Sequence, residues 1–222
     1  MGSMSRPHNT QGKAAYHHGD LRRSLIDNAL ELIRDNGIEG LSLRKLAERV
    51  GVSQTALYHY FKDKQDLLLA IGETVVEQFT QTLIDSITDQ PTGKQLEAFV
   101  VAYIRYAREN PELYELLLGR TTWKNARPHA FHQTARHSIR RFGDVLQGLQ
   151  QNGALSADID TLRLVQVSWA TLHGLCRMYN DGLAFTPETI EDIARYAATL
   201  LQQTVARNAP APGSRETDRS VR

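Results

Sequence analysis

Apolar residues recur every three or four positions along most of the chain, which is the spacing of one face of an α-helix. The first series begins after Gly19, and the dipeptide Asn36-Gly37 is typical of the left-handed turn that ends a helix. Its apolar positions are Leu21, Leu25, Ala29, Leu32 and Ile33. We find no pattern that predicts a strand, so the sequence predicts an all-α fold.

Two short helices are predicted next, each started by a serine that caps the first turn. Ser42 precedes a helix over 43–50 that Gly51 ends, and Ser53 precedes a helix over 54–61. Hydrophobic staples at the two starts are expected to pair Leu41 with Leu46 and Val52 with Leu57.

Longer helices are predicted for the remainder of the chain. Asp63 is expected to cap a helix that runs to about Thr88, which is long enough to join a small head to a larger body. Prolines at 111, 128 and 187 mark further starts, because the first helical position needs no N–H. These helices are expected at about 94–109, 111–119, 127–151, 160–180 and 187–206, which makes about nine in all.

The segment from Ser42 to Leu68 has the layout of a helix-turn-helix, in which one helix braces a second across a turn of three or four residues. In the second helix Ala56, Leu57, Tyr60 and Phe61 can face the core. The opposite face carries Gln54, Thr55, Tyr58 and His59, whose donors and acceptors suit base edges and phosphates in the major groove. Cations surround this helix at Arg44, Lys45, Arg49, Lys62 and Lys64.

Composition adds modest support. Residues 1–62 hold nine Lys and Arg against six Asp and Glu, whereas residues 63–222 hold seventeen against nineteen, which fits a DNA-facing N-terminal end. Cys176 is the only cysteine, so no intramolecular disulfide is possible. No apolar run is long enough to cross a bilayer and the N-terminus has no apolar signal region, so we expect a cytoplasmic protein without membrane contact.

The block from Gly19 to Ile71 resembles the TetR family of repressors, and its most specific part is VS..ALYHYF.DK..LL, from Val52 to Leu68. The resemblance implies a homodimer that reads palindromic operator DNA and releases it when a small-molecule effector occupies a C-terminal domain. It implies base contacts by Gln54, Thr55 and Tyr58, backbone proximity of His59 and Tyr60, and phosphate contacts by Ser42, Arg44, Ser53 and Lys64.

The resemblance and the polar composition of the two ends together predict a domain division. We expect residues 1–18 to be a disordered arm, 19–65 the DNA-binding domain, 66–206 the ligand-binding and dimerisation domain, and 207–222 a disordered tail. The last two long helices, about 160–180 and 187–206, would build the dimer interface. Their apolar stripes are wide enough to serve both that interface and the monomer core.

A second, shorter resemblance lies at Trp169 and His173-Gly174, which are similar to the Trp…His-Gly signature of one C-terminal subgroup. Trp169, His173 and Cys176 share a helical face and are candidate ligand contacts, but core or interface packing explains them equally well. Tyr103, Tyr106, Tyr114 and Trp123 could add aromatic pocket wall or be plain core. Burial as a small apolar residue is the favoured role for Cys176.

Other function classes have little support. His129 and His132 lie three residues apart and His137 follows, but no carboxylate or cysteine lies beside them at ligand spacing, so we expect no metal. No catalytic motif or glycine-rich phosphate loop is present, so we expect no cofactor and no enzyme activity. A helical interaction module without a DNA role is the remaining alternative, and the polar face of the 54–61 helix distinguishes the two.

Overall fold

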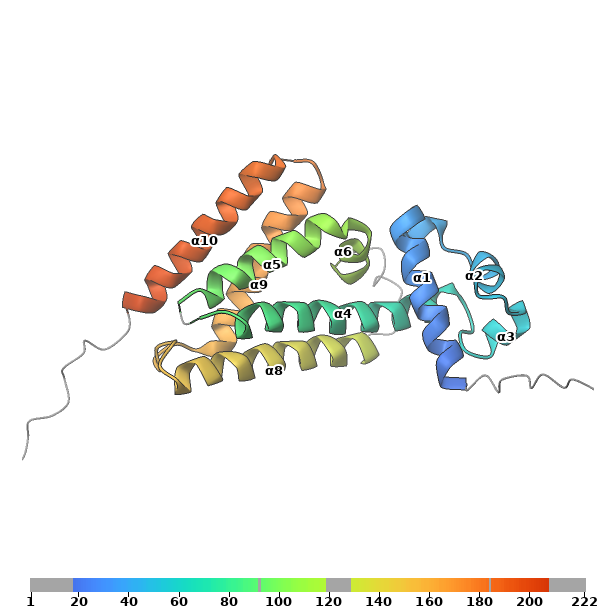
Figure 1. Ribbon diagram of the computed structural model, residues 1–222, viewed down its shortest axis with the longest axis horizontal. Helices are drawn as coiled ribbons and strands as arrows, with labels where there is room; N and C mark the ends of the chain where they lie inside the picture. The colour runs from blue at the N-terminus through green and yellow to red at the C-terminus, as the bar shows by residue number, and fades with distance from the viewer. Residues whose placement is uncertain (1–17, 92, 119–128, 184, 208–222) are drawn as a thin grey trace, which may run out of the picture.

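The computed structural model describes residues 18–91, 93–118, 129–183 and 185–207, and in these it contains helices and no strands (Figure 1). The predicted all-α fold is therefore confirmed. Its helices are α1 (His18–Gly40), α2 (Leu43–Val50), α3 (Gln54–Tyr58), α4 (Lys64–Thr88), α5 (Gln95–Glu109), α6 (Pro111–Leu118), α8 (His129–Gln151), α9 (Thr161–Asn180) and α10 (Pro187–Arg207). The expected terminal disorder concerns residues that lie almost entirely outside the described ranges.

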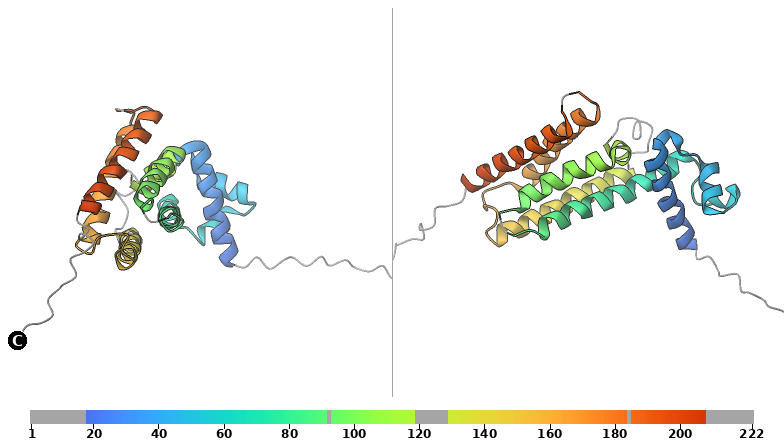
Figure 2. Two further views of the ribbon diagram at one scale, coloured as in Figure 1. Left: turned by 60° about the vertical axis from the view of Figure 1, so that its left-hand side comes forward. Right: turned by 45° about the horizontal axis from the view of Figure 1, so that its top comes forward.

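Helices α1, α2 and α3 form a small head at one end of the molecule, and α4 runs from it into the larger bundle (Figures 1 and 2). Leu46 of α2 and Leu57 of α3 are fully buried in a core shared with α1. In the bundle, α5 and α8 pack along α4, while α9 packs against α5 and α8 and α10 packs along α5. One continuous apolar core therefore joins head and bundle through α4.

The predicted caps are present. The Ser42 hydroxyl accepts the N–H of Lys45 at 3.2 Å, and the Ser53 hydroxyl accepts the N–H of Ala56 at 3.1 Å. The Asp63 carboxylate accepts the N–H of Asp66 at 2.7 Å and so starts α4. Each side chain pairs a backbone donor that has no partner within its helix.

One predicted stop is confirmed and another comes earlier than predicted. Gly37 has the expected positive φ of 70°, and the kink at this residue separates the long helical run of α1 from a short stretch that reaches Gly40. The 54–61 helix ends earlier, at Tyr58. The N–H groups of Tyr60 and Phe61 both bond to the Leu57 carbonyl, and this tightened turn redirects the chain toward α4 while Phe61 stays buried.

Among the helices of the described residues, none combines the length and apolar character needed to cross a bilayer.

Candidate nucleic-acid interface and ligand pocket

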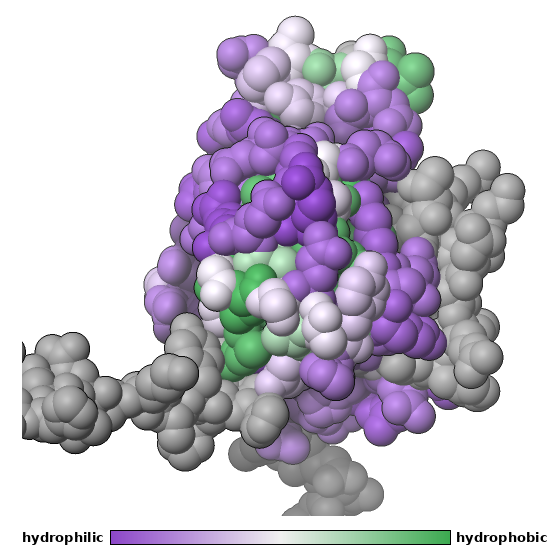
Figure 3. All heavy atoms as spheres, turned by 90° about the vertical axis from the view of Figure 1, so that its right-hand side faces the viewer, coloured by the Kyte–Doolittle hydropathy of each residue, from purple (hydrophilic) through white to green (hydrophobic). Residues whose placement is uncertain are grey.

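Helix α3 presents a polar face to solvent. Gln54, Thr55, Tyr58 and His59 are all exposed, whereas Leu57 on the opposite side is completely buried. Tyr58 keeps 51 % of its surface accessible, a large value for an aromatic side chain in a small helical domain. The end of the molecule that carries the head is largely hydrophilic, as Figure 3 shows. This arrangement leaves four donor- and acceptor-bearing side chains free of the protein core.

Two arginines connect the helices of the head to one another. The Arg49 guanidinium on α2 donates to Glu31 and to Asn28 on α1 and lies 3.9 Å from Asp35. The Arg22 guanidinium stacks over the Phe61 ring at 5.5 Å, a cation–π contact that holds the end of the α3 turn. These contacts fix α2 and α3 against α1, so Arg49 has a structural role that its position in the sequence did not reveal.

The residues predicted to bind phosphates lie in the head, and each has a partner within the protein. Ser42 and Ser53 use their hydroxyls as caps. Arg44 forms an exposed ion pair with Glu48 at 3.0 Å. Lys64 donates from Nζ to the Ile38 carbonyl at 2.9 Å, which ties the start of α4 to α1. Phosphate contact by these four residues stays a prediction, as does backbone proximity of His59 and the half-buried Tyr60.

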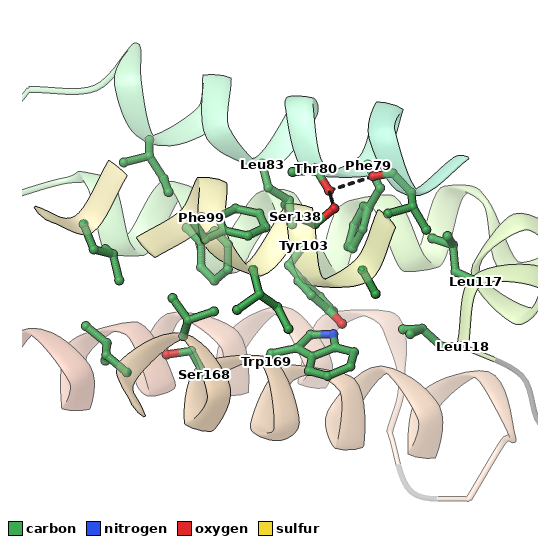
Figure 4. A pocket seen from close by; sticks show the side chains of 18 of the residues that line it. Phe79, Thr80, Leu83, Phe99, Tyr103, Leu117, Leu118, Ser138, Ser168 and Trp169 are labelled. Atoms are coloured by element: carbon green, nitrogen blue, oxygen red, sulfur yellow. Dashed lines mark hydrogen bonds between the residues drawn. The ribbon is translucent and has the colours of Figure 1, made fainter. Parts of the chain in front are cut away.

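The bundle contains an apolar cavity of about 150 Å³ between α4, α5, α6, α8 and α9 (Figure 4). Among the described residues, none that lines the cavity is charged. Its walls are Val76, Phe79, Thr80, Leu83, Ile87, Leu96, Phe99, Tyr103, Leu117, Leu118, Ala135, Ser138, Ile139, Phe142, Leu146, Leu164, Val165, Ser168 and Trp169. A cavity of this size and polarity suits a small apolar molecule.

Two of the predicted ligand contacts, Tyr103 and Trp169, line this cavity. Tyr106, His173 and Cys176 are not among its lining residues, and Trp123 lies outside the described part of the chain. Tyr106 packs instead on Phe79 with ring centroids 4.6 Å apart, and burial raises the pKa of its phenol to about 12. Cys176 is fully buried, as expected, and burial raises the pKa of its thiol to about 12.

Most lining residues were not singled out from the sequence. They lie on the apolar faces of α4, α5 and α8, and apolar residues at helical spacing predict burial without distinguishing a filled core from a cavity. The two hydroxyls on facing helices, Thr80 and Ser138, lie 2.9 Å apart, a pairing that no local pattern indicates.

A hydrogen-bonded chain of side chains leads from the cavity to the surface of α9. The Tyr103 and Tyr114 hydroxyls lie 3.3 Å apart, and the Tyr114 hydroxyl lies 2.8 Å from Nδ1 of His173. Burial raises the pKa of both phenols, so both stay protonated. Burial lowers the pKa of His173, and the nearby Arg177 cation lowers it further, so the imidazole is neutral at pH 7.

His137 of α8 is exposed, and the side chains of His129 and His132 are outside the described set. Within the described residues, His, Cys, Asp and Glu form no group of three or more with the geometry of a metal site.

Two domain families match the sequence. Residues 25–71 match the family described as bacterial regulatory proteins, tetR family, and residues 96–217 match the tetracyclin repressor-like C-terminal domain. The second match alone spans more than half of the chain.

Curated relatives match only part of the chain. The class C tetracycline repressor protein of Escherichia coli is 53% identical over 55 residues, which are 25% of each chain. The fatty acid metabolism regulator protein of Bacillus subtilis is 32% identical over 78 residues, 35% of this chain and 40% of that one. The chain thus matches well under half of the length of these relatives.

Solved structures match over most of the chain. A protein with unknown function from Rhodococcus sp. RHA1 superimposes with a TM-score of 0.70 at 28% identity, covering 87% of this chain and all of that one. The transcriptional regulator FadR of Bacillus subtilis, solved in complex with stearoyl-CoA, has a TM-score of 0.58 at 19% identity, covering 81% and 96%. At that identity FadR shows a shared fold.

Proposed function

The chain belongs to the TetR family of bacterial regulatory proteins, and from this premise we propose that it is a repressor that binds palindromic operator DNA as a homodimer and leaves it when a small-molecule effector binds. Its relatives are transcriptional regulators with a helix-turn-helix, not enzymes. The observation that carries the proposal is the exposed polar face of α3, Gln54, Thr55, Tyr58 and His59, on a helix braced by α1 and α2.

DNA recognition follows from this face. Amide and hydroxyl groups at the start of α3 can pair with base edges, and the cations of the head can neutralise phosphates. Arg44 and Lys45 are both exposed on the neighbouring α2. Because phosphate contacts release counterions, the affinity for duplex DNA should fall steeply as salt rises.

Dimerisation is supported by apolar side chains left exposed on the last two helices. Val167 is 59% exposed on α9 and Tyr196 is 65% exposed on α10. Leu162, Met178 and Leu200 add to this surface, whereas Leu172, Ile190 and Ala194 from the same helices are buried in the monomer. A surface of this composition fits burial against a second copy of the chain, which would set two α3 helices for half-sites about 34–36 Å apart.

Effector control is supported by the position of α4. Its N-cap, Asp63, follows the α3 turn, and its later turns carry Phe79, Thr80 and Leu83 into the cavity wall. Helix α6 makes a second connection, because Leu117 lines the cavity while Glu112 lies against α1 at Gly37. A ligand that prefers one arrangement of these helices would change the spacing of the two heads and so weaken DNA binding.

The experiment is a fluorescence-polarisation assay with the duplex upstream of the protein's own gene, run across a salt series. The triple variant Gln54→Ala, Thr55→Ala, Tyr58→Phe should lose about 100-fold or more in affinity, since each base contact contributes about 1–3 kcal/mol. Gln133→Ala, exposed on α8 far along the chain from the head, is the matched control and should bind like the parent. Unchanged binding by the triple variant would refute the DNA-reading role of α3.

A further inference from the structure

The cavity offers few polar groups to a ligand. The Thr80 and Ser138 hydroxyls have two protons for three acceptors within reach: the Val76 carbonyl at 2.7 Å, the Thr134 carbonyl at 3.1 Å and each other at 2.9 Å. Both protons are therefore already used within the protein. At another part of the wall the Tyr103 hydroxyl lies beside the indole nitrogen of Trp169, as Figure 4 shows. Because no charged side chain among the described residues lines the cavity, a charged ligand group would be buried among them without a counter-charge at high cost.

Tyr103 differs from the other lining groups because its hydroxyl continues into the hydrogen-bonded chain through Tyr114 to His173. Tyr103 and Tyr114 are each only 1% exposed, so water does not readily replace either partner. His173 is half-buried on α9 and ends the chain. The direction in which the two phenols donate is therefore set by whether Nδ1 of His173 carries a proton.

Two arrangements of the protons use the stronger nitrogen and oxygen acceptors, because the Cys176 thiol, which also lies beside the Tyr114 hydroxyl, is only a weak acceptor. With Nδ1 unprotonated, Tyr114 donates to His173 and Tyr103 donates to Tyr114, so the Tyr103 proton points away from the cavity. With Nδ1 protonated, His173 donates to Tyr114, Tyr114 donates to Tyr103, and the Tyr103 proton becomes available to the cavity. An empty apolar cavity favours the first arrangement, because the second leaves a buried donor without a partner.

We propose that Tyr103 is the polar anchor of the effector and that Tyr114 and His173 set its donor direction, so that the effector is a compact apolar molecule with one uncharged hydrogen-bond acceptor, such as a ketone or ester carbonyl. This inference rests on the effector role proposed above. The acceptor pairs with the Tyr103 proton in the second arrangement, while the apolar body fills the space between Phe79, Phe99 and Phe142.

The groups around His173 determine the sign of a pH effect. Arg177 on α9 and Glu115 and Tyr114 on α6 are the charged and titratable groups that act on it, and Arg177 is itself paired with Glu115 and Asp181. Helix α5 contributes Tyr103 through the Tyr114 hydroxyl. The Cys176 thiol on α9 faces the Tyr114 hydroxyl and stays protonated, and it accepts more weakly than the Tyr103 oxygen. Protonation of His173 therefore favours the second arrangement, so affinity for an acceptor ligand should rise as the pH falls through the pKa of His173.

The test compares acetophenone with ethylbenzene, which differ by a carbonyl oxygen, using isothermal titration calorimetry on the full chain. Tyr103→Phe should weaken acetophenone binding by about 3- to 10-fold, the worth of one net hydrogen bond, and leave ethylbenzene binding unchanged. Tyr106→Phe, whose ring packs on Phe79 outside the cavity lining, is the matched control that should leave both affinities unchanged.

The same measurement across pH tests the positioning residues. As the pH falls from about 8 through the lowered pKa of His173, the parent should gain roughly 3-fold in acetophenone affinity, while ethylbenzene affinity stays constant. Tyr114→Phe and His173→Gln should abolish this gain while still binding ethylbenzene, which also shows that the variants are folded. A parent affinity for acetophenone that does not change with pH would overturn the role of His173.

Other outcomes separate this inference from the proposed function. Equal acetophenone affinities in the parent and Tyr103→Phe would overturn Tyr103 as the anchor. Failure of ethylbenzene to bind the parent would overturn the apolar ligand class. The duplex assay uses neither compound, so it tests DNA recognition by α3 independently of these results.

Discussion

Cys176 lies fully buried near the Tyr114 hydroxyl, and burial raises the pKa of its thiol from an ordinary value of 9.0 to about 12. The thiolate is the reactive form of cysteine, so a thiol that is both buried and protonated reacts slowly. The residue therefore contributes packing to α9, and redox sensing by this side chain has no support in its surroundings.

We predict that the folded protein resists a thiol reagent at about pH 8 and reacts promptly once unfolded in urea. The folded pKa is raised, so the stability contributed by the neutral thiol is complete below pH 9.0 and is lost as the pH rises toward about 12. Tyr106, with its pKa raised from 10.0 to about 12, adds to the same alkaline loss. Urea unfolding at increasing pH measures it, and prompt labelling of the folded protein would contradict the prediction.

At the scale of helices, two arginines of α2 have different roles although nothing in the sequence distinguishes them. Arg49 reaches back to Asn28, Glu31 and Asp35 on α1, whereas Arg44 is exposed and paired only along its own helix with Glu48 among the contacts described. Exposed ion pairs contribute little each, but the three contacts of Arg49 fix the angle between two helices.

Comparing Arg49→Ala with Arg44→Ala separates bracing from phosphate binding. Arg49→Ala should lower thermal stability and weaken duplex binding while leaving the slope of log affinity against log salt unchanged. Arg44→Ala should leave stability nearly unchanged and reduce that slope by about one, the signature of a lost phosphate contact. Polarisation over a salt series and thermal unfolding measure both. The converse pattern would assign the phosphate contact to Arg49.

At the scale of the whole molecule, the surface of α9 and α10 decides whether two heads can act together. A charged side chain placed on this surface should prevent association of two copies. Burying an unpaired charge between them would cost on the order of several kcal/mol of binding free energy. The exposed positions Val167 and Tyr196 are suited to the test, since neither contributes to the monomer core.

We predict that Val167→Glu combined with Tyr196→Glu yields a monomer by sedimentation analysis with helical content retained. The variant should also lose most operator affinity, because a single head contacts one half-site. Gln133→Glu on α8 adds a charge at an exposed position and should leave the assembly unchanged. A double variant that still sediments as a dimer would place the interface on another face.

The sequence alone determined the features that depend on residues close together in the chain, namely the helices, their caps and the helix-turn-helix. The spacing of Leu43, Leu46 and Val50, the caps at Ser42, Ser53 and Asp63, and the positive φ at Gly51 are local, so the helices and the helix-turn-helix could be predicted. The exposed and buried sides of α3 followed from the same periodicity, because a helix fixes which residues share a face. The predicted end of this helix, Phe61, lies three residues beyond the observed end at Tyr58. The tight turn after Tyr58 keeps hydrogen bonds of helical type to the Leu57 carbonyl, so the sequence pattern does not distinguish it from helix.

Only the tertiary structure decided where helices distant in sequence meet. The cavity depends on how five helices fail to fill the space between them, and its lining has the same apolar composition as the core. The link from Tyr103 through Tyr114 to His173, and the attachment of Lys64 to the Ile38 carbonyl, join residues that no periodicity relates. Such contacts arise from the packing of whole helices, so they become visible only when all of those helices are placed together.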